Sequence, residues 1–153
     1  MMLALVAGLV RAGDFGFEEG GVALWLPDSW SVDIEDGRLA AVSVDGNAAV
    51  ELVVLKGAAE LETAERSCRA RLAQSYRQWR ETAARREASL GGMRGFTFSG
   101  EGVRDGVRRS VRVVVFKAPQ RYLMLAWSAE SARAAQSKAA YDQIAASVKA
   151  VRR

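Results

Sequence analysis

The 153-residue chain contains no histidine and only one cysteine, Cys68. Histidine is the commonest general base, pH switch and metal ligand, so its absence removes the usual basis of a catalytic or metal site. A single cysteine excludes an intrachain disulfide. No stretch approaches the roughly 20 apolar residues that a membrane-spanning helix requires. The sequence therefore offers neither a catalytic constellation nor a transmembrane span.

The composition is typical of a single globular domain. Half of the residues are apolar and 26% are charged, which is ordinary for a folded chain and unlike a disordered one. The formal net charge is +4, and most of the positive charge comes from arginines that are interleaved with glutamates. This pattern favours a solvated surface over a nucleic-acid or anionic-membrane interface.

Residues 1–20 form an N-terminal apolar segment and loop. Residues 1–10 (MMLALVAGLV) have the length of a signal-peptide hydrophobic region, and Ala12 precedes Gly13 at a small-residue cleavage site. No basic residue precedes the run, so two interpretations remain. It is a signal remnant, which makes the protein periplasmic or secreted, or an ordered element of a cytoplasmic protein.

Short apolar runs separated by turn residues predict strands on both sides of a helical region. Pro27 ends the first run because it cannot donate a hydrogen bond, and Trp30 follows the turn as an apolar plug. In the next run, residues 31–35, Val32 and Ile34 are expected to face inward, and Asp36-Gly37 after it is a hairpin signal. The expected strands cover residues 22–26, 31–35, 38–44, 48–56, 93–99, 108–117 and 121–128.

Two helices are expected. The first covers residues 60–89, with Gly91-Gly92 as its C-terminal cap, and the second covers residues 132–151, with Ser131 as N-cap. The apolar stripe of the first helix is Leu61, Ala64, Cys68, Leu72, Tyr76, Trp79 and Ala83, and that of the second is Ala134, Tyr141, Ile144, Val148 and Val151. This order predicts an α+β fold, an antiparallel sheet of six to seven strands flanked by both helices.

The order of elements, together with three local patterns, resembles the PsbP-like superfamily. Pro27 and Trp30 match its Pro-x-x-Trp turn, residues 91–95 match its glycine-containing second β block, and residues 144–148 (IAASV) match its closing helix. The resemblance extends over residues 21–151, and residues 21–153 are expected to form the single domain. Its implied fold is an antiparallel sheet flanked by helices.

The same resemblance implies binding to other proteins rather than a shared chemistry. Members include a photosystem II extrinsic subunit, a Ran-binding transport factor, DcrB-like envelope proteins and the Eag chaperones of type VI secretion effectors. This chain lacks the lipoprotein cysteine after its apolar run, and no residues match the photosystem or Ran-binding roles.

Several groups have both a functional and a structural interpretation. Cys68 could be a nucleophile, but its place on an apolar stripe favours packing. Asp33, Glu35 and Asp36 could bind a divalent cation, but they suit a solvated hairpin tip. The Gly-rich residues 91–95 follow a helix rather than a strand, unlike a phosphate loop. We therefore expect no catalytic residue, cofactor or metal.

Four arginines, Arg104, Arg108, Arg109 and Arg112, fall on one expected hairpin. They could bind an acidic partner, or they could protect an edge strand by charge. Within a strand, Arg108 and Arg112 share one face and Arg109 points to the other.

The candidate site is a face of the sheet. If the helices leave one face open, Trp25, Leu123, Leu125 and Trp127 form an apolar groove, rimmed by Arg108 and Arg112. If a helix covers that face, these residues belong to the core. The resulting hypothesis is a non-enzymatic, protein-binding domain of the bacterial cell envelope. The alternatives are a cytosolic Eag-like chaperone and an enzyme that uses Cys68, and a second copy of the chain is a further conceivable partner.

Overall fold

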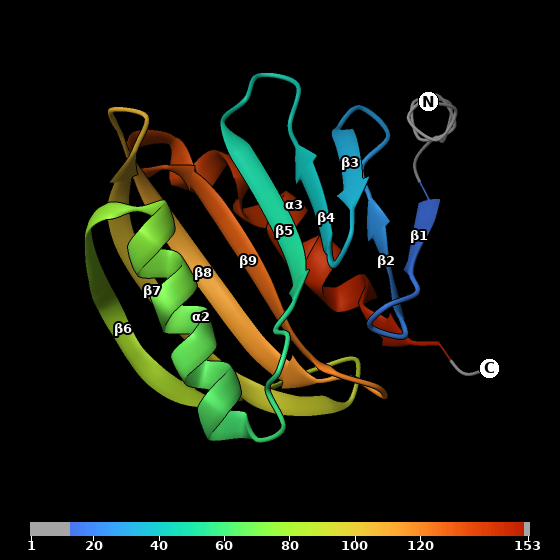
Figure 1. Cartoon of the computed structure of the whole chain (residues 1–153). Helices are drawn as coiled ribbons and strands as arrows, with labels where there is room; N and C mark the ends of the chain where they lie inside the picture. The colour runs from blue at the N-terminus through green and yellow to red at the C-terminus, as the bar shows by residue number, and fades with distance from the viewer. Residues whose placement is uncertain (1–12, 152–153) are drawn as a thin grey trace.

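A computed structural model describes residues 13–151 (Figure 1). The interpretations of residues 1–12 as a signal remnant or ordered element lie outside the described residues. The elements in chain order are β1 (Gly13–Phe17), β2 (Val22–Leu26), β3 (Ser31–Glu35), β4 (Arg38–Val42), β5 (Ala48–Val54), α2 (Leu61–Ser75), β6 (Arg77–Leu90), β7 (Met93–Arg104), β8 (Val107–Lys117), β9 (Tyr122–Glu130), the 3-10 helix η1 (Ser131–Arg133), α3 (Ala134–Ser147) and β10 (Lys149–Ala150). The predicted α+β class is confirmed.

The strands form two antiparallel sheets. The large sheet has seven strands in the order β3-β4-β5-β9-β8-β7-β6, and the small sheet has three in the order β1-β2-β10. Helix α2 packs on one face of the large sheet, and α3 lies on the other face together with the small sheet (Figure 1). The expected strand 22–26 is therefore the middle strand of the small sheet, and β1 occupies a segment that was expected to be a loop.

Each face of the large sheet supports its own hydrophobic core. Leu123, Leu125 and Trp127 of β9 point toward α3, while Met124 and Ala126 point toward α2. All five side chains are buried. Strand β9 lies between β5 and β8, so it is apolar on both faces because both are covered.

The long helix expected over residues 60–89 is wrong in its second half. Helix α2 ends at Ser75, and residues 77–90 form β6, an edge strand whose side chains are mostly exposed. The buried side chains of the predicted stripe are Ala64, Cys68, Leu72 and Tyr76, so the apolar face that packs against the sheet ends at Tyr76. Gly91 and Gly92, with φ of 57° and 82°, form a two-residue hairpin turn rather than a helix cap. Pairing with β7 then overrides the helix propensity of the segment.

The last helix is shorter than expected. It begins after Arg133 and ends at Ser147. Ser131 does not cap it: this residue lies in η1, and its hydroxyl is 3.0 Å from the hydroxyl of Ser110. Val148 is buried as expected, but Val151 is 42% exposed. Likewise Ile34 is 49% exposed, contrary to the inward orientation expected for it.

A candidate binding face of the large sheet

Helix α3 covers the part of the sheet where the apolar groove was expected. Leu123 and Leu125 are fully buried, and Trp127 is 7% exposed. The ring of Trp127 lies 5.4 Å from that of Tyr141 on α3. Trp25 is on β2 of the small sheet, half-buried against the same core, and its backbone N–H donates to the Ser147 hydroxyl at 2.7 Å. These four residues are therefore core residues in this structure, and they form no open groove.

The arginines of the β7–β8 hairpin separate into two environments. Arg108 and Arg112 point to the α3 side, as strand alternation predicted; Arg108 is exposed and Arg112 is half-buried. Arg109 is directed away from them, and its guanidinium donates to the Asn47 carbonyl at 3.0 Å and to the Ser128 hydroxyl at 3.2 Å. Arg104 lies over the Tyr76 ring, 5.6 Å from its centre. Strand β8 is an inner strand, so its arginines do not protect an edge.

Beyond α3, the same face of the sheet continues over β6, β7 and β8. Helix α3 packs on β9, β5 and the small sheet, and the α3-side residues Thr97, Ser99, Glu101 and Val103 of β7 are only half-buried. We call this surface the open strip; it contains Thr82, Ser99, Glu101, Ser110 and Arg112, with Trp127 at its inner margin. Together with Gly100 and Val111, these six residues line a cavity of about 250 Å³. The uncovered part of the sheet is thus polar rather than apolar.

Two polar side chains of the open strip, Glu101 and Ser110, already have partners, whereas Thr82, Ser99, Arg112 and Trp127 form no side-chain hydrogen bond or ion pair among the described residues. Arg80 donates to Glu101 at 3.0 Å, and Ser110 pairs with Ser131. The indole N–H of Trp127, by contrast, is shielded from solvent and has no hydrogen-bond partner among the described residues. The guanidinium carbon of Arg112 lies 5.7 Å from the centre of the Tyr141 ring. Within residues 13–151, Arg112 has no hydrogen bond or ion pair to a carboxylate.

Tyr141 connects these two donors. It is 4% exposed, and burial raises the pKa of its hydroxyl, while the positive charge of Arg112 lowers it. The ring stacks obliquely on Trp127 and lies beneath Arg112. Helix α3 therefore fixes the positions of both side chains at the margin of the open strip.

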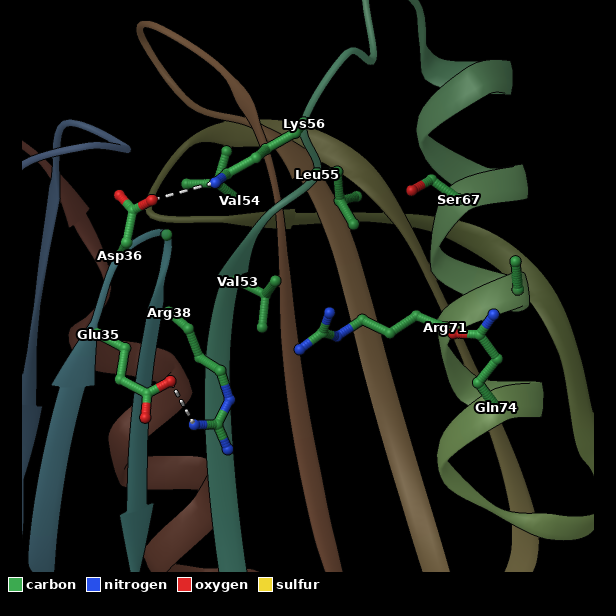
Figure 2. A pocket seen from close by; sticks show the side chains of 12 residues that line it. Glu35, Asp36, Arg38, Val53, Val54, Leu55, Lys56, Ser67, Arg71 and Gln74 are labelled. Carbon is green, nitrogen blue, oxygen red and sulfur yellow. Dashed lines mark hydrogen bonds and ion pairs between the residues drawn. The ribbon is translucent and has the colours of Figure 1, made fainter.

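A second hollow, of about 480 Å³, lies between α2, β5 and the β3–β4 hairpin (Figure 2). Its charges largely neutralise one another. Lys56 is paired with Asp36 at 3.3 Å, and Arg38 is paired with Glu51 at 2.5 Å. Figure 2 shows Arg71 reaching from α2 toward β5, where its guanidinium lies 3.9 Å from the Glu51 carboxylate. This hollow leaves fewer unsatisfied groups for a ligand than the open strip does.

The other sequence candidates are placed clear of the open strip. Cys68 is fully buried, with its sulfur 3.4 Å from that of Met124, and burial raises its pKa to about 12. Its predicted packing role is confirmed. Asp33, Glu35 and Asp36 are exposed on the β3–β4 hairpin. In the part of the chain that the structure describes, no group of three or more acidic or cysteine side chains is arranged to hold a metal ion.

Sequence reasoning missed the polar half of the site. Thr82 was assigned to a helix, so its position beside β7 was not foreseen. The alternation of Phe96 and Phe98 with Thr97 and Ser99 did indicate a strand with one apolar and one polar face. This alternation, together with Arg112 on the same face of the next strand, was the signal in the sequence from which a polar sheet face could have been predicted.

Comparison with known proteins identifies the fold but no family. No protein-family model and no curated protein matches this chain. The solution structure of cyanobacterial PsbP (CyanoP) from Synechocystis sp. PCC 6803 is similar at 16% identity and a TM-score of 0.64, covering 92% of this chain and 94% of that one. LpqN, involved in cell envelope biogenesis of Mycobacterium tuberculosis, is similar at 13% identity and a TM-score of 0.55, covering 93% and 91%.

A crystal structure from Bacteroides thetaiotaomicron VPI-5482 is similar at 11% identity and a TM-score of 0.63, covering 94% of this chain. This chain spans 50% of that longer one. At such low identities the similarities establish a PsbP-like fold, in agreement with the resemblance seen in the sequence. Among the described residues, no helix combines the length and apolar character needed to cross a membrane.

Proposed function

We propose that this domain is a non-enzymatic binding module that holds another protein against the open strip. The observation that carries the proposal is the combination of an uncovered sheet face with two donors, Arg112 and the Trp127 N–H, that lack acceptors. Of the six contacts expected from the sequence, Arg112 and Trp127 are the direct ones, and Arg108 lies at the outer margin. Trp25, Leu123 and Leu125 act from the core by supporting β9 and α3.

The cell envelope is the proposed location. Support comes from the fold shared with LpqN, which is described as involved in cell envelope biogenesis. The alternative of an Eag-like chaperone would require an apolar surface able to shield a helix. The exposed large apolar side chains of the described residues are Ile34, Val42, Val44, Val107 and Val151, and only Val42 and Val44 come from the same segment. No specific observation favours the chaperone.

Site-directed photo-crosslinking in the native cells tests the binding role. A crosslinking amino acid at Arg108, exposed beside the open strip, is expected to capture a discrete protein. The same amino acid at Glu62, exposed on α2 across the sheet, serves as the control and is expected to capture none. Adding Arg112→Gln should reduce the yield from position 108.

Equal capture from both positions, or capture that is insensitive to Arg112→Gln, would contradict binding at the open strip. N-terminal sequencing of the crosslinked chain tests the location. A mature start near Gly13 with envelope proteins captured supports the envelope, whereas an intact Met1 with a secretion effector captured supports the chaperone.

A further inference from the structure

We propose that the cavity of the open strip binds a carboxylate, supplied by an aspartate or glutamate side chain of the protein partner. This inference rests on the binding role proposed above and names the chemical group that is recognised. The two donors are the indole N–H of Trp127 and the guanidinium of Arg112.

The first argument is the unpaired N–H of Trp127. Trp127 is only 7% exposed, and its indole nitrogen has no hydrogen-bond partner among the described residues. Folded proteins seldom leave a buried donor without an acceptor, because its lost hydration is not replaced. Trp127 lines the cavity itself. An acceptor atom supplied from the cavity would satisfy this donor once a shift of side chains at the cavity margin uncovers the indole nitrogen, which is shielded from solvent in this structure.

The second argument is the position of Arg112. It is the direct cross-strand partner of Trp127 in the β8–β9 register, so the two side chains are neighbours on one face. Six other arginines each form an ion pair with a carboxylate: Arg38, Arg69, Arg71, Arg80, Arg85 and Arg133. Arg112 instead contacts the face of Tyr141. Its fork of N–H groups is therefore available to an anion.

The third argument concerns which anion fits. A carboxylate has two oxygens in one plane, one for the indole N–H and one for the guanidinium, and such charge-assisted hydrogen bonds are strong. Arg112 is the single cation lining the cavity, while Glu101, held by Arg80, also lines it. The carboxylate of Glu101 would repel a dianion such as phosphate more than a monoanion. The balance of charge favours one carboxylate.

The fourth argument concerns its source. The cavity opens on a half-buried sheet face, so a side chain projecting from a docked protein can reach it. The chain carries a net charge of +4, and Arg108 lies exposed on the same face of the same strand. Both favour an acidic protein surface over an isolated small acid.

Proton–nitrogen NMR of the four indole N–H groups tests the proposal directly. The probes are sodium acetate and a blocked peptide containing one glutamate, and the controls are sodium chloride at equal ionic strength and the matching glutamine peptide. The Trp127 signal is assigned by its loss in Trp127→Phe. We expect the glutamate peptide to shift this proton downfield with saturation, while the indole signals of Trp25, Trp30 and Trp79 stay in place.

Two matched variants link the shift to the site. Arg112→Gln is expected to weaken binding of the glutamate peptide about tenfold or more, the loss expected for a charge-assisted hydrogen bond. Arg66→Gln removes the same charge from the exposed side of α2, across the sheet from the cavity, and should change the affinity less than about twofold. Well-dispersed NMR spectra verify that each variant is folded. Arg112→Lys keeps the positive charge but not the planar fork of N–H groups, so it should bind the peptide with an intermediate affinity.

The outcomes are distinct. Saturation by the glutamate peptide with loss in Arg112→Gln supports the proposal. Saturation by acetate alone overturns the protein side chain as the source, because the cavity then selects a free acid. A Trp127 signal that neither probe moves, or that moves equally in Arg112→Gln, overturns the carboxylate site. In that case crosslinking from position 108 still decides the broader binding role independently.

Discussion

Arg109 and Arg112 stand three residues apart on β8 and have opposite environments. Arg109 donates to the Asn47 carbonyl and to Ser128, and so joins the β4–β5 turn to two strands. Arg112 has a single aromatic contact and no carboxylate partner among residues 13–151. Side-chain position, rather than residue type, therefore separates a structural arginine from one available to a ligand.

This difference predicts unequal effects of the same substitution. Arg109→Gln should lower the free energy of unfolding by about 1.5–3 kcal/mol, the typical value of hydrogen bonds made by a charged group. Arg112→Gln should lower it by less than about 1 kcal/mol, because only a cation–π contact is lost. Urea denaturation of both variants measures the difference. Equal losses would contradict the structural role assigned to Arg109.

Cys68 predicts a specific pH dependence of stability. Its pKa is about 12 in the folded protein against 9.0 for a free thiol, because burial disfavours the thiolate. The raised pKa means that stability is full below pH 9.0 and falls as the pH rises toward 12, since only the unfolded chain ionises in that window. At about pH 10.5 the loss from this group should be about 2 kcal/mol.

Comparison with Cys68→Ala isolates this contribution. The alanine variant should be less stable at neutral pH because of its cavity, but it should lack the extra decline between neutral pH and about pH 10.5. Parallel urea denaturation of both proteins at the two pH values measures it. Identical declines in the two proteins would show that the Cys68 thiol does not titrate differently on unfolding.

At the scale of elements, the segment after Tyr76 shows where sequence reasoning reaches its limit. Residues 77–90 are rich in Arg, Glu and Ala, and local propensity favours a helix for them. The structure uses them as an edge strand because β7 offers an unpaired edge and the Gly91-Gly92 turn returns the chain to it. Strand pairing of this kind is a tertiary effect that neither periodicity nor propensity reports. The inner strands β5, β8 and β9 are predictable, because continuous apolar runs mark burial on both faces.

The two turn glycines provide a test of the hairpin. A Cβ on Gly91 would lie 2.2 Å from the Val148 carbonyl oxygen, whereas one on Gly92 would meet nothing within 4 Å. Both residues have positive φ, so each alanine substitution costs about 1 kcal/mol in backbone strain. Gly91→Ala should cost at least about 1–2 kcal/mol more, because the backbone of Val148 has to move.

Thermal denaturation of the paired variants measures this difference. The Gly92→Ala variant is the matched control, since it shares the turn and the strain but not the contact. Equal destabilisation by the two substitutions would mean that the β6–β7 turn does not pack against the chain at Val148. Preserved stability in both would contradict the turn conformation itself.

At the scale of the whole molecule, the two helices cover unequal parts of one sheet. Helix α2 packs on one face, while α3 and the small sheet cover the other face only in part and leave the open strip. The sequence predicted the first half of the long helix, the last helix and the shared face of Arg108 and Arg112, but not how far α3 extends across the sheet. That extent decides whether Trp127 is a core residue or a surface residue. It depends on packing between segments far apart in sequence, so the polar cavity beside Trp127 required the structure.

Strand β9 contributes side chains to the hydrophobic cores on both faces of the large sheet. We therefore expect the domain to unfold as one cooperative unit. Leu125→Ala on the α3 side and Met124→Ala on the α2 side should each cost about 2–5 kcal/mol, because both side chains are buried. Each should lower the stability of the whole domain in a single transition, since the two cores have no separate sheets to retain. The exposed Val44→Ala, at 79% exposure, should change it by less than about 0.5 kcal/mol.

Two probes on opposite faces decide the question. Reaction of Cys68 with a thiol reagent follows the α2 side, and tryptophan fluorescence follows mainly the α3 side, where Trp25, Trp30 and Trp127 pack. Coincident urea transitions by both probes, shifted together in Leu125→Ala, are expected for one cooperative unit. If Leu125→Ala shifted only the fluorescence transition, the two cores would unfold separately. The large sheet would then not couple the open strip to α2.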